Sequence, residues 1–179
     1  ALIAIGLDDE AINRGITTFT SLPHRLQWVA SCGKVQFIND SKATNGIAAA
    51  KALAIFNDIY WIAGGIAKQD GLSPTMLHLG SVKKAYLIGT AATAFATSLT
   101  GICPVRICGS LEQATRASFD DASANPDGGT ILLAPAAASF DQFPSFRARG
   151  DAFAALAHDL CTKGFATHSA VKGRENNHA

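Results

Sequence analysis

The chain has 179 residues, of which 48% are hydrophobic and only 16% charged, with a formal net charge of +1. This length and composition suit one globular domain with a core that needs no metal or disulfide, and they exclude a disordered chain. The 15 Lys and Arg residues are scattered along the sequence. A nucleic-acid partner is therefore not expected, because its binding needs clustered basic charge.

The four cysteines are Cys32, Cys103, Cys108 and Cys161, and they form no CxxC pair and no Cys/His ligand series. We expect reduced thiols in a cytoplasmic protein and no structural zinc or other metal site in this chain. No secretory signal is recognised at the start. Residues 85–105 carry no charge, but glycines and a proline interrupt them. They fit strand, turn and helix better than a membrane span.

The first 21 residues differ from those that follow. They are typical of the end of a helix, a turn, and a second helix capped near Asp8 or Asp9. Two helical pieces before the first strand resemble the tail of a preceding domain. We therefore expect residues 1–21 to be the tail of a preceding domain, residues 22–162 to form the main domain, and residues 163–179 to be a loose polar tail.

Strands and helices alternate after Pro23. A hairpin is predicted from residues 25–31 and 35–39, joined at Cys32 and Gly33. Further strands are predicted at 59–63, 85–89, 105–108 and 130–134, and helices at 45–56, 74–79, 91–99, 111–124 and 146–160. The alternation predicts an α/β, Rossmann-like fold: a mostly parallel sheet with helices on both faces and an N-terminal hairpin strand.

Three polar clusters follow predicted strands, at residues 40–45, 64–68 and 134–146. In parallel sheets, ligands bind beyond the carboxyl ends of the strands. We therefore expect the three clusters to converge at one edge of the sheet.

The first cluster reads DSKATN, from Asp40 to Asn45. Capping of the next helix accounts for Thr44 or Asn45 alone, but it does not account for Asp40 and Lys42 together between a buried strand and a helix start. The helix N-terminus, the hydroxyls and Lys42 favour a carboxylate or phosphate ligand.

The other two clusters are weaker signals. The glycines at 64–65 followed by Lys68 form no Walker A loop, and alone they indicate a flexible turn with an exposed lysine. Beside Lys42, Lys68 becomes a second clamp for an anion. In the third cluster, small residues let the backbone approach a ligand, and three aromatic side chains are expected to anchor the loop by burial: Phe140, Phe143 and Phe146.

Four single residues in or near these clusters have both a structural and a functional interpretation. His24 follows a proline and alone is more often structural, whereas Arg25 is a more credible phosphate contact. Ser139 lacks the G-x-S-x-G context of a nucleophile. Asp141 can cap the following segment or pair with one of the arginines at 147 and 149.

The segments "LPHRLQ", "NDSKATN", "AGGIAK" and "LLAPAAASFDQFPSFRARGDAF" together resemble the C-terminal domain of the Mur ligase family, over roughly Leu22 to Leu160. The DSKATN run is similar to the D-glutamate-adding branch of that family. The resemblance implies peptidoglycan precursor synthesis: ATP activates the L-alanyl carboxylate of UDP-N-acetylmuramoyl-L-alanine as an acyl phosphate, which the amine of D-glutamate attacks.

The resemblance also implies roles for individual residues. Lys42 is expected near the reacting carboxylate, as the catalytic residue. D-glutamate is expected to contact Thr44, Lys68, Ser139 and the backbone of Phe140 and Phe146. The nucleotide is expected to contact His24, Arg25 and Asp40. The resemblance implies that ATP and Mg²⁺ are held mainly by a central, ATP-binding domain, of which residues 1–21 would be the tail. The chain alone is therefore expected to be inactive without the central and N-terminal domains.

Two departures from the family pattern stand in the loops. Alanines occupy positions 134 and 137, where a serine and a cysteine are familiar, and Ile66 and Ala67 replace an Asp-Gly pair. One alternative is a free-standing Rossmann-like module that binds an acidic ligand without catalysis. A NAD-dependent oxidoreductase is a weaker alternative, because it requires G-x-G-x-x-G after the first strand, and this motif is absent.

Overall fold

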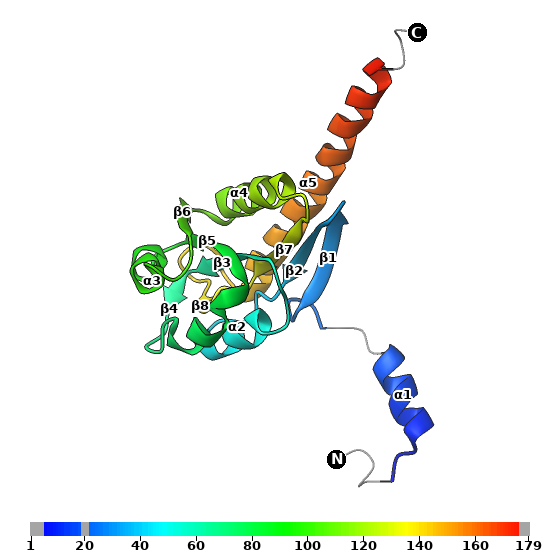
Figure 1. Cartoon of the computed structure of the whole chain (residues 1–179). Coiled ribbons are helices and arrows are strands. Elements are labelled where there is room, and N and C mark those ends of the chain that lie inside the picture. Colours follow the sequence, from blue (N-terminus) through cyan, green and yellow to red (C-terminus); the bar gives the residue numbers. More distant parts are fainter. Residues whose placement is uncertain (1–5, 19–21, 176–179) are drawn as a thin grey trace.

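The computed structural model describes residues 6–18 and 22–175, with side chains to residue 163. A six-stranded sheet with the order β1-β2-β7-β3-β5-β6 forms its centre (Figure 1). The strands are β1 (Gln27–Cys32), β2 (Val35–Asn39), β3 (Ile59–Gly64), β5 (Val82–Ile88), β6 (Val105–Gly109) and β7 (Gly129–Leu133). Only β1 is antiparallel to its neighbour. The predicted α/β fold with an N-terminal hairpin is confirmed.

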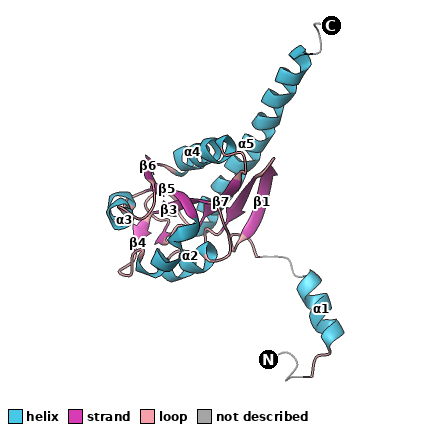
Figure 2. Cartoon of the chain, viewed as in Figure 1, coloured by secondary structure: helices cyan, strands magenta, loops and turns pink. Residues whose placement is uncertain are grey.

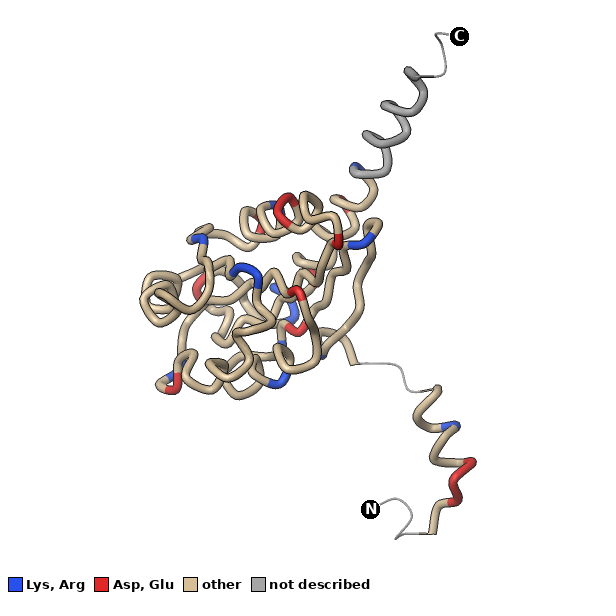
Figure 3. The backbone as a smooth tube through the Cα atoms, in the orientation of Figure 1, with Lys and Arg blue, Asp and Glu red and all other residues tan. Residues whose placement is uncertain are grey.

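Helices cover both faces of this sheet (Figure 2). The covering helices are α2 (Gly46–Leu53), the 3₁₀ helix η2 (Ser73–Ser81), α3 (Ala92–Leu99), α4 (Leu111–Ala124) and α5 (Phe146–Glu175). Helix α1 (Asp9–Thr18) lies apart from the sheet (Figure 1). Strand side chains alternate between two buried clusters. In β3, Trp61 packs in the cluster with α2, η2 and α3, while Ile62 packs in the cluster with α4 and α5. Among the described residues, positions with charged side chains are distributed over several parts of the fold (Figure 3).

Side-chain caps fix the starts of three helices. Asn45 accepts a hydrogen bond from the amide of Ala48 at the start of α2, and Ser110 accepts one from the amide of Gln113 at the start of α4. The carboxylate of Asp8 accepts a hydrogen bond from an amide in α1. Each cap satisfies an amide that has no partner within the helix. The helix end predicted at the start of the chain lies partly outside the described residues.

Two features differ from the sequence prediction. Helix α5 continues to Glu175 and does not end near Leu160, so the segment predicted as a loose tail begins as helix. Two short strands, β4 (Ile66–Ala67) and β8 (Ala137–Ala138), form an antiparallel pair that was not predicted. They are too short to show a hydrophobic alternation.

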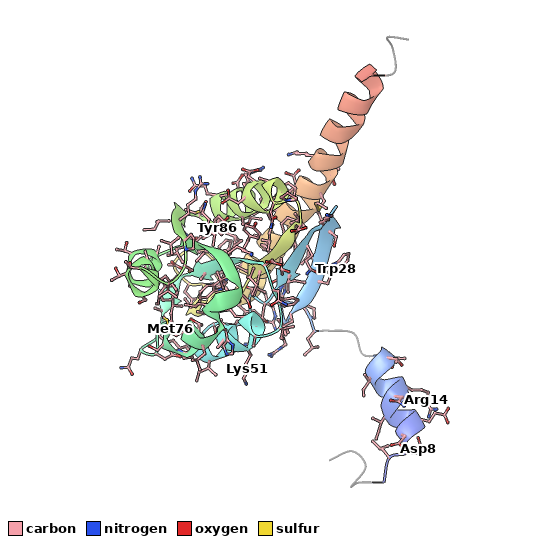
Figure 4. The ribbon with its side chains drawn as sticks, in the orientation of Figure 1. Asp8, Arg14, Trp28, Lys51, Met76 and Tyr86 are labelled. Atoms are coloured by element: carbon pink, nitrogen blue, oxygen red, sulfur yellow. A yellow bond between two sulfur atoms is a disulfide. The ribbon has the colours of Figure 1, made fainter. Side chains whose placement is uncertain are left out.

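The prediction of four reduced thiols is wrong for two of them. Cys32 and Cys161 form a disulfide, shown in yellow in Figure 4, while Cys103 and Cys108 are free. The physical reason is the packing of α5 against β1, which brings the two Cα atoms to 5.2 Å, within the usual range for a disulfide. These cysteines lie 129 residues apart, so their spacing gave no signal.

None of the helices in the described part of the chain has the length and hydrophobicity that crossing a bilayer requires. The uncharged stretch 85–105 contains most of β5, all of α3 and the first residue of β6, as its glycines and proline predicted.

Candidate functional site

The three polar clusters meet at the carboxyl edge of the sheet. The amide of Asp40 donates to the carbonyl of Leu133 at 2.8 Å, and the amide of Gly64 donates to the carbonyl of Pro135 at 2.8 Å. Pairing of β4 with β8 adds a second connection between the last two clusters. The expected convergence is therefore present in the structure.

A buried arginine holds these loops together. The Arg149 side chain is only 1% exposed. It donates to the hydroxyl and the carbonyl oxygen of Ser41, both at 3.0 Å, to the carbonyl of Ala137 at 3.1 Å, and to the carbonyl of Gly64 at 3.4 Å. Burial lowers the pKa of Arg149 to about 10, and the charge of Asp141 opposes this shift. One guanidinium thus joins residues from all three clusters.

Sequence reasoning considered this arginine only as a partner for Asp141. The charge of Asp141 does act on Arg149, and its carboxylate also accepts a hydrogen bond from the amide of Thr90 at 2.9 Å. Arg149 lies 108 residues from Ser41 in the sequence, so no local pattern could have indicated the contact.

A cavity of about 460 Å³ opens beside the DSKATN loop and helix α2. Its lining residues are Arg25, Leu26, Asp40, Lys42, Ala43, Asn45, Ile47, Ala48, Lys51 and Ala52. Three of these are cationic and one is acidic, so the lining favours an anionic ligand. Lys51, labelled in Figure 4, was not predicted. Lys51 lies four residues after Ile47 in α2, which places the two side chains on the same face of the helix. This spacing could have indicated that Lys51 faces the same cavity as the start of α2.

Asp40 is a buried carboxylate at this cavity, with 9% exposure. One of its oxygens accepts a hydrogen bond from the amide of Leu26 at 3.1 Å. Burial raises the pKa of Asp40, while this hydrogen bond and the charge of Arg25 lower it. The carboxylate is therefore fixed in position and has a second oxygen with which to accept a hydrogen bond.

Lys42 is positioned by the start of α5. Its ammonium lies 4.2 Å from the centre of the Phe146 ring, a cation–π distance. Its amide donates to the carbonyl of His24 at 3.1 Å, and the hydroxyl of Ser41 donates to the carbonyl of Phe146 at 2.8 Å. Phe146 is thus joined to the DSKATN loop by its ring and by its backbone.

His24 lies behind the cavity and does not line it. Its ring is buried, accepts a hydrogen bond from the Asn39 amide group at 3.2 Å, and contacts Phe146 edge-on at 6.1 Å. The second ring nitrogen is 3.6 Å from a carboxylate oxygen of Asp151. The structure therefore places Arg25 and Asp40 at the cavity and His24 in the support beneath it.

The other predicted site residues do not line this cavity. Thr44 is half-buried between Lys42 and the α2 cap. Lys68 is exposed after β4, and Ser139 is buried after β8. Thr44, Lys68, Ser139, Phe140 and Phe146 are all absent from the cavity lining. The expected burial of Phe140 is wrong, because its side chain is 71% exposed; Phe143 and Phe146 supply the apolar contacts of this loop.

No group of three or more His, Cys, Asp or Glu side chains is close enough to hold a metal ion among the described residues.

No family model matches the chain, but curated relatives do. Three of them are named UDP-N-acetylmuramoylalanine–D-glutamate ligase. The protein of Caulobacter vibrioides is 44% identical over 161 residues, which are 90% of this chain and 34% of the relative. That of Dinoroseobacter shibae is 49% identical over 152 residues (85% and 32%), and that of Agrobacterium fabrum 42% over 174 residues (97% and 37%). Over 85% to 97% of its length the chain is therefore similar to one part of UDP-N-acetylmuramoylalanine–D-glutamate ligases.

The chain spans about a third of the length of these ligases. Among solved structures, the bifunctional folylpolyglutamate synthase/dihydrofolate synthase of Yersinia pestis is similar, with a TM-score of 0.57 and 26% identity. The match covers 84% of this chain and 34% of that one. The resemblance read from the motifs is therefore confirmed, both for the ligase family and for the fold.

Proposed function

We propose that this chain is the C-terminal domain of an ATP-dependent ligase that adds D-glutamate to UDP-N-acetylmuramoyl-L-alanine in cytoplasmic peptidoglycan precursor synthesis. The observation that carries the proposal is the cationic cavity beside the DSKATN loop, at the edge where all three polar clusters meet. The similarity to D-glutamate ligases over most of this chain supports the choice of substrates.

The proposed reaction has two steps. The terminal phosphoryl group of ATP passes to the L-alanyl carboxylate and gives an acyl phosphate and ADP. The amine of D-glutamate then attacks the acyl carbon, and the tetrahedral intermediate collapses to the amide with release of phosphate. Negative charge develops on the acyl phosphate and on the tetrahedral oxygen, and the ammonium of Lys42 stabilises it. The ring of Phe146 at 4.2 Å keeps this ammonium in place.

The cavity residues fit part of a nucleotide. The Arg25 guanidinium suits phosphate oxygens, and the Asp40 carboxylate, held by the amide of Leu26, suits a hydroxyl donor. The volume of the cavity, about 460 Å³, is within the usual range for small-ligand pockets. The described residues offer no acidic cluster for Mg²⁺, so we assign the magnesium ions and most ATP contacts to the central domain.

D-glutamate carries two carboxylates and needs cations and hydrogen-bond donors. We assign these contacts to Thr44, Lys68, Ser139 and the backbone at Phe140 and Phe146. Lys68 and Ser139 directly follow the paired strands β4 and β8, so that pairing fixes the backbone from which both side chains project. We assign His24 to the nucleotide edge, where its ring contacts Phe146.

We assign residues 1–21 to the preceding central domain, residues 22–162 to the C-terminal domain, and residues 163–179 to a tail. Helix α1 contributes no buried residue and lies apart from the sheet in Figure 1, which supports its packing on another domain. Since the phosphoryl-transfer machinery is assigned to that domain, the 179-residue chain alone is expected to be inactive.

The test is ATP-dependent incorporation of labelled D-glutamate by a ligase that joins this chain to the upstream domains. Lys42→Ala is expected to lower kcat by about 10²–10³-fold, the usual effect of removing one electrostatic stabiliser. The control is Lys83→Ala, which removes an exposed lysine paired with Asp58 at the opposite edge of the sheet. Unchanged turnover in both variants would contradict the role of Lys42, and ligation by the isolated chain would contradict the domain assignment.

A further inference from the structure

A second cavity of about 400 Å³ lies at the end of the sheet opposite the candidate site. It is formed where the turn between β1 and β2, the end of α4 and helix α5 meet. The Cys32–Cys161 disulfide is part of its wall, together with Phe119, Ala122 and Pro126. A cavity of this size admits a small molecule, so the disulfide is open to one.

The disulfide is unusual under the proposed function. Disulfides in the cytoplasm of most organisms are transient and catalytic or redox-sensing, because thiol reductants keep structural cysteines reduced. From this and from the open cavity, we propose that Cys32 and Cys161 form a reversible redox site that exchanges with a small anionic thiol of the glutathione class. The expectation of a reducing compartment rests on the proposed function, whereas the accessibility of the disulfide rests on the cavity alone.

The charge beside the disulfide favours an anionic thiol. Lys34 lies two residues after Cys32, lines the cavity and donates a hydrogen bond to the carbonyl of Pro126 at 2.8 Å. The ammonium attracts a thiol that carries carboxylates and stabilises a thiolate formed nearby. Cys32 is the half-buried member of the pair and Cys161 the buried one, with 8% exposure. Attack is therefore directed at the sulfur of Cys32.

The exchange is balanced in two steps. In reduction, the thiolate of the small thiol attacks the sulfur of Cys32, the sulfur–sulfur bond breaks, and Cys161 leaves as a thiolate that takes up a proton. A second small thiolate then attacks the mixed disulfide at the sulfur of the small thiol. Cys32 is released as a thiol and the small molecule leaves as its own disulfide. Oxidation is the reverse, with that small disulfide as the oxidant.

The bond connects the hairpin to the helix that supports the candidate site. Cys161 lies in α5, and the same helix begins with Phe146 and carries Arg149. Phe37 in β2 also packs against Phe153 in α5, with ring centroids 6.0 Å apart, and this contact does not involve the disulfide. The reduced domain is therefore expected to stay folded but to unfold at a lower temperature than the oxidised domain.

The test uses the complete chain equilibrated in buffers with graded ratios of reduced to oxidised glutathione. Thiols are trapped with an alkylating reagent and counted by mass. The Cys103→Ser/Cys108→Ser double variant isolates the proposed pair. The pair is expected to pass from oxidised to reduced across the cytoplasmic range of ratios, with a lower melting temperature at the reducing end. A pair that stays oxidised throughout, or that never forms the bond, overturns the proposal.

Kinetics test the access route separately. Lys34→Ala is expected to slow reduction by glutathione severalfold and to change reduction by uncharged 2-mercaptoethanol by less than twofold. The control Arg14→Ala removes a positive charge from α1 (Figure 4) and is expected to change neither rate. Equal slowing with both thiols overturns the role of charge at the cavity. Because ligation is not measured, failure here is distinct from failure of the proposed function.

Discussion

Replacement of Arg149 by methionine is the sharpest structural test of how the three loops are held. The side chain donates to three backbone carbonyls, those of Ser41, Gly64 and Ala137, and to the hydroxyl of Ser41. Loss of a donor to a buried acceptor costs about 1–3 kcal/mol. Burial of the methionine and removal of a desolvated charge offset part of that sum. We therefore expect a loss of about 3–5 kcal/mol in the free energy of unfolding.

Urea unfolding followed by circular dichroism measures this loss. The control is Arg147→Met, which changes the exposed arginine two positions earlier, in contact with the Phe146 ring at 5.3 Å, and is expected to stay within about 0.5 kcal/mol of wild type. Arg149→Lys is expected to recover only part of the loss, because an ammonium cannot reproduce the guanidinium fork. A loss below about 1 kcal/mol for Arg149→Met would refute the assigned role.

Three further predictions follow from single contacts. Burial raises the folded-state pKa of Asp40 above 3.8, so the protonated carboxyl stabilises the fold below pH 3.8 and this stabilisation is lost as pH rises through the folded pKa. Asp40→Asn is therefore expected to stabilise the domain at pH 7 by roughly 0.5–2 kcal/mol, and by less at lower pH, as measured by thermal unfolding. The same variant is expected to bind the nucleotide more weakly. Cys32→Ser opens a cross-link spanning 129 residues and is expected to cost up to about 5 kcal/mol in urea without reductant; no loss would contradict the bond. Gly64 has φ +127°, and Gly64→Ala places a methyl group against the carbonyl of Ile88, so we expect a loss of more than about 3 kcal/mol in the free energy of unfolding. Gly101 has φ +75° and open space around it, so Gly101→Ala is expected to cost about 1 kcal/mol. Equal losses would refute the steric cause.

Features encoded by neighbouring residues could be predicted from the sequence. The hairpin, the helix caps at Asn45 and Ser110 and the order of strands and helices each depend on a short pattern. The convergence of the polar clusters followed from the general rule that parallel strands share a carboxyl edge.

Features that depend on contacts distant in the sequence could not be predicted. The clamp formed by Arg149 and the Cys32–Cys161 bond join residues more than a hundred positions apart. The burial of Phe140 was predicted from its hydrophobicity, but the side chain is exposed, because an apolar side chain need not be buried when it lies in a loop. The polar composition after Leu160 predicted a loose tail, but α5 continues to Glu175.

The measurement that tests the central claim most directly is an amide-resolved NMR titration of this chain with D-glutamate and, separately, with L-glutamate. The loops are already held by Arg149, so we predict a preformed acceptor site. D-glutamate is expected to shift the amides around Thr44, Lys68 and Ser139, with weaker effects from the L enantiomer. Equal shifts from both enantiomers, or no shifts in these loops, would contradict a D-glutamate site on this domain.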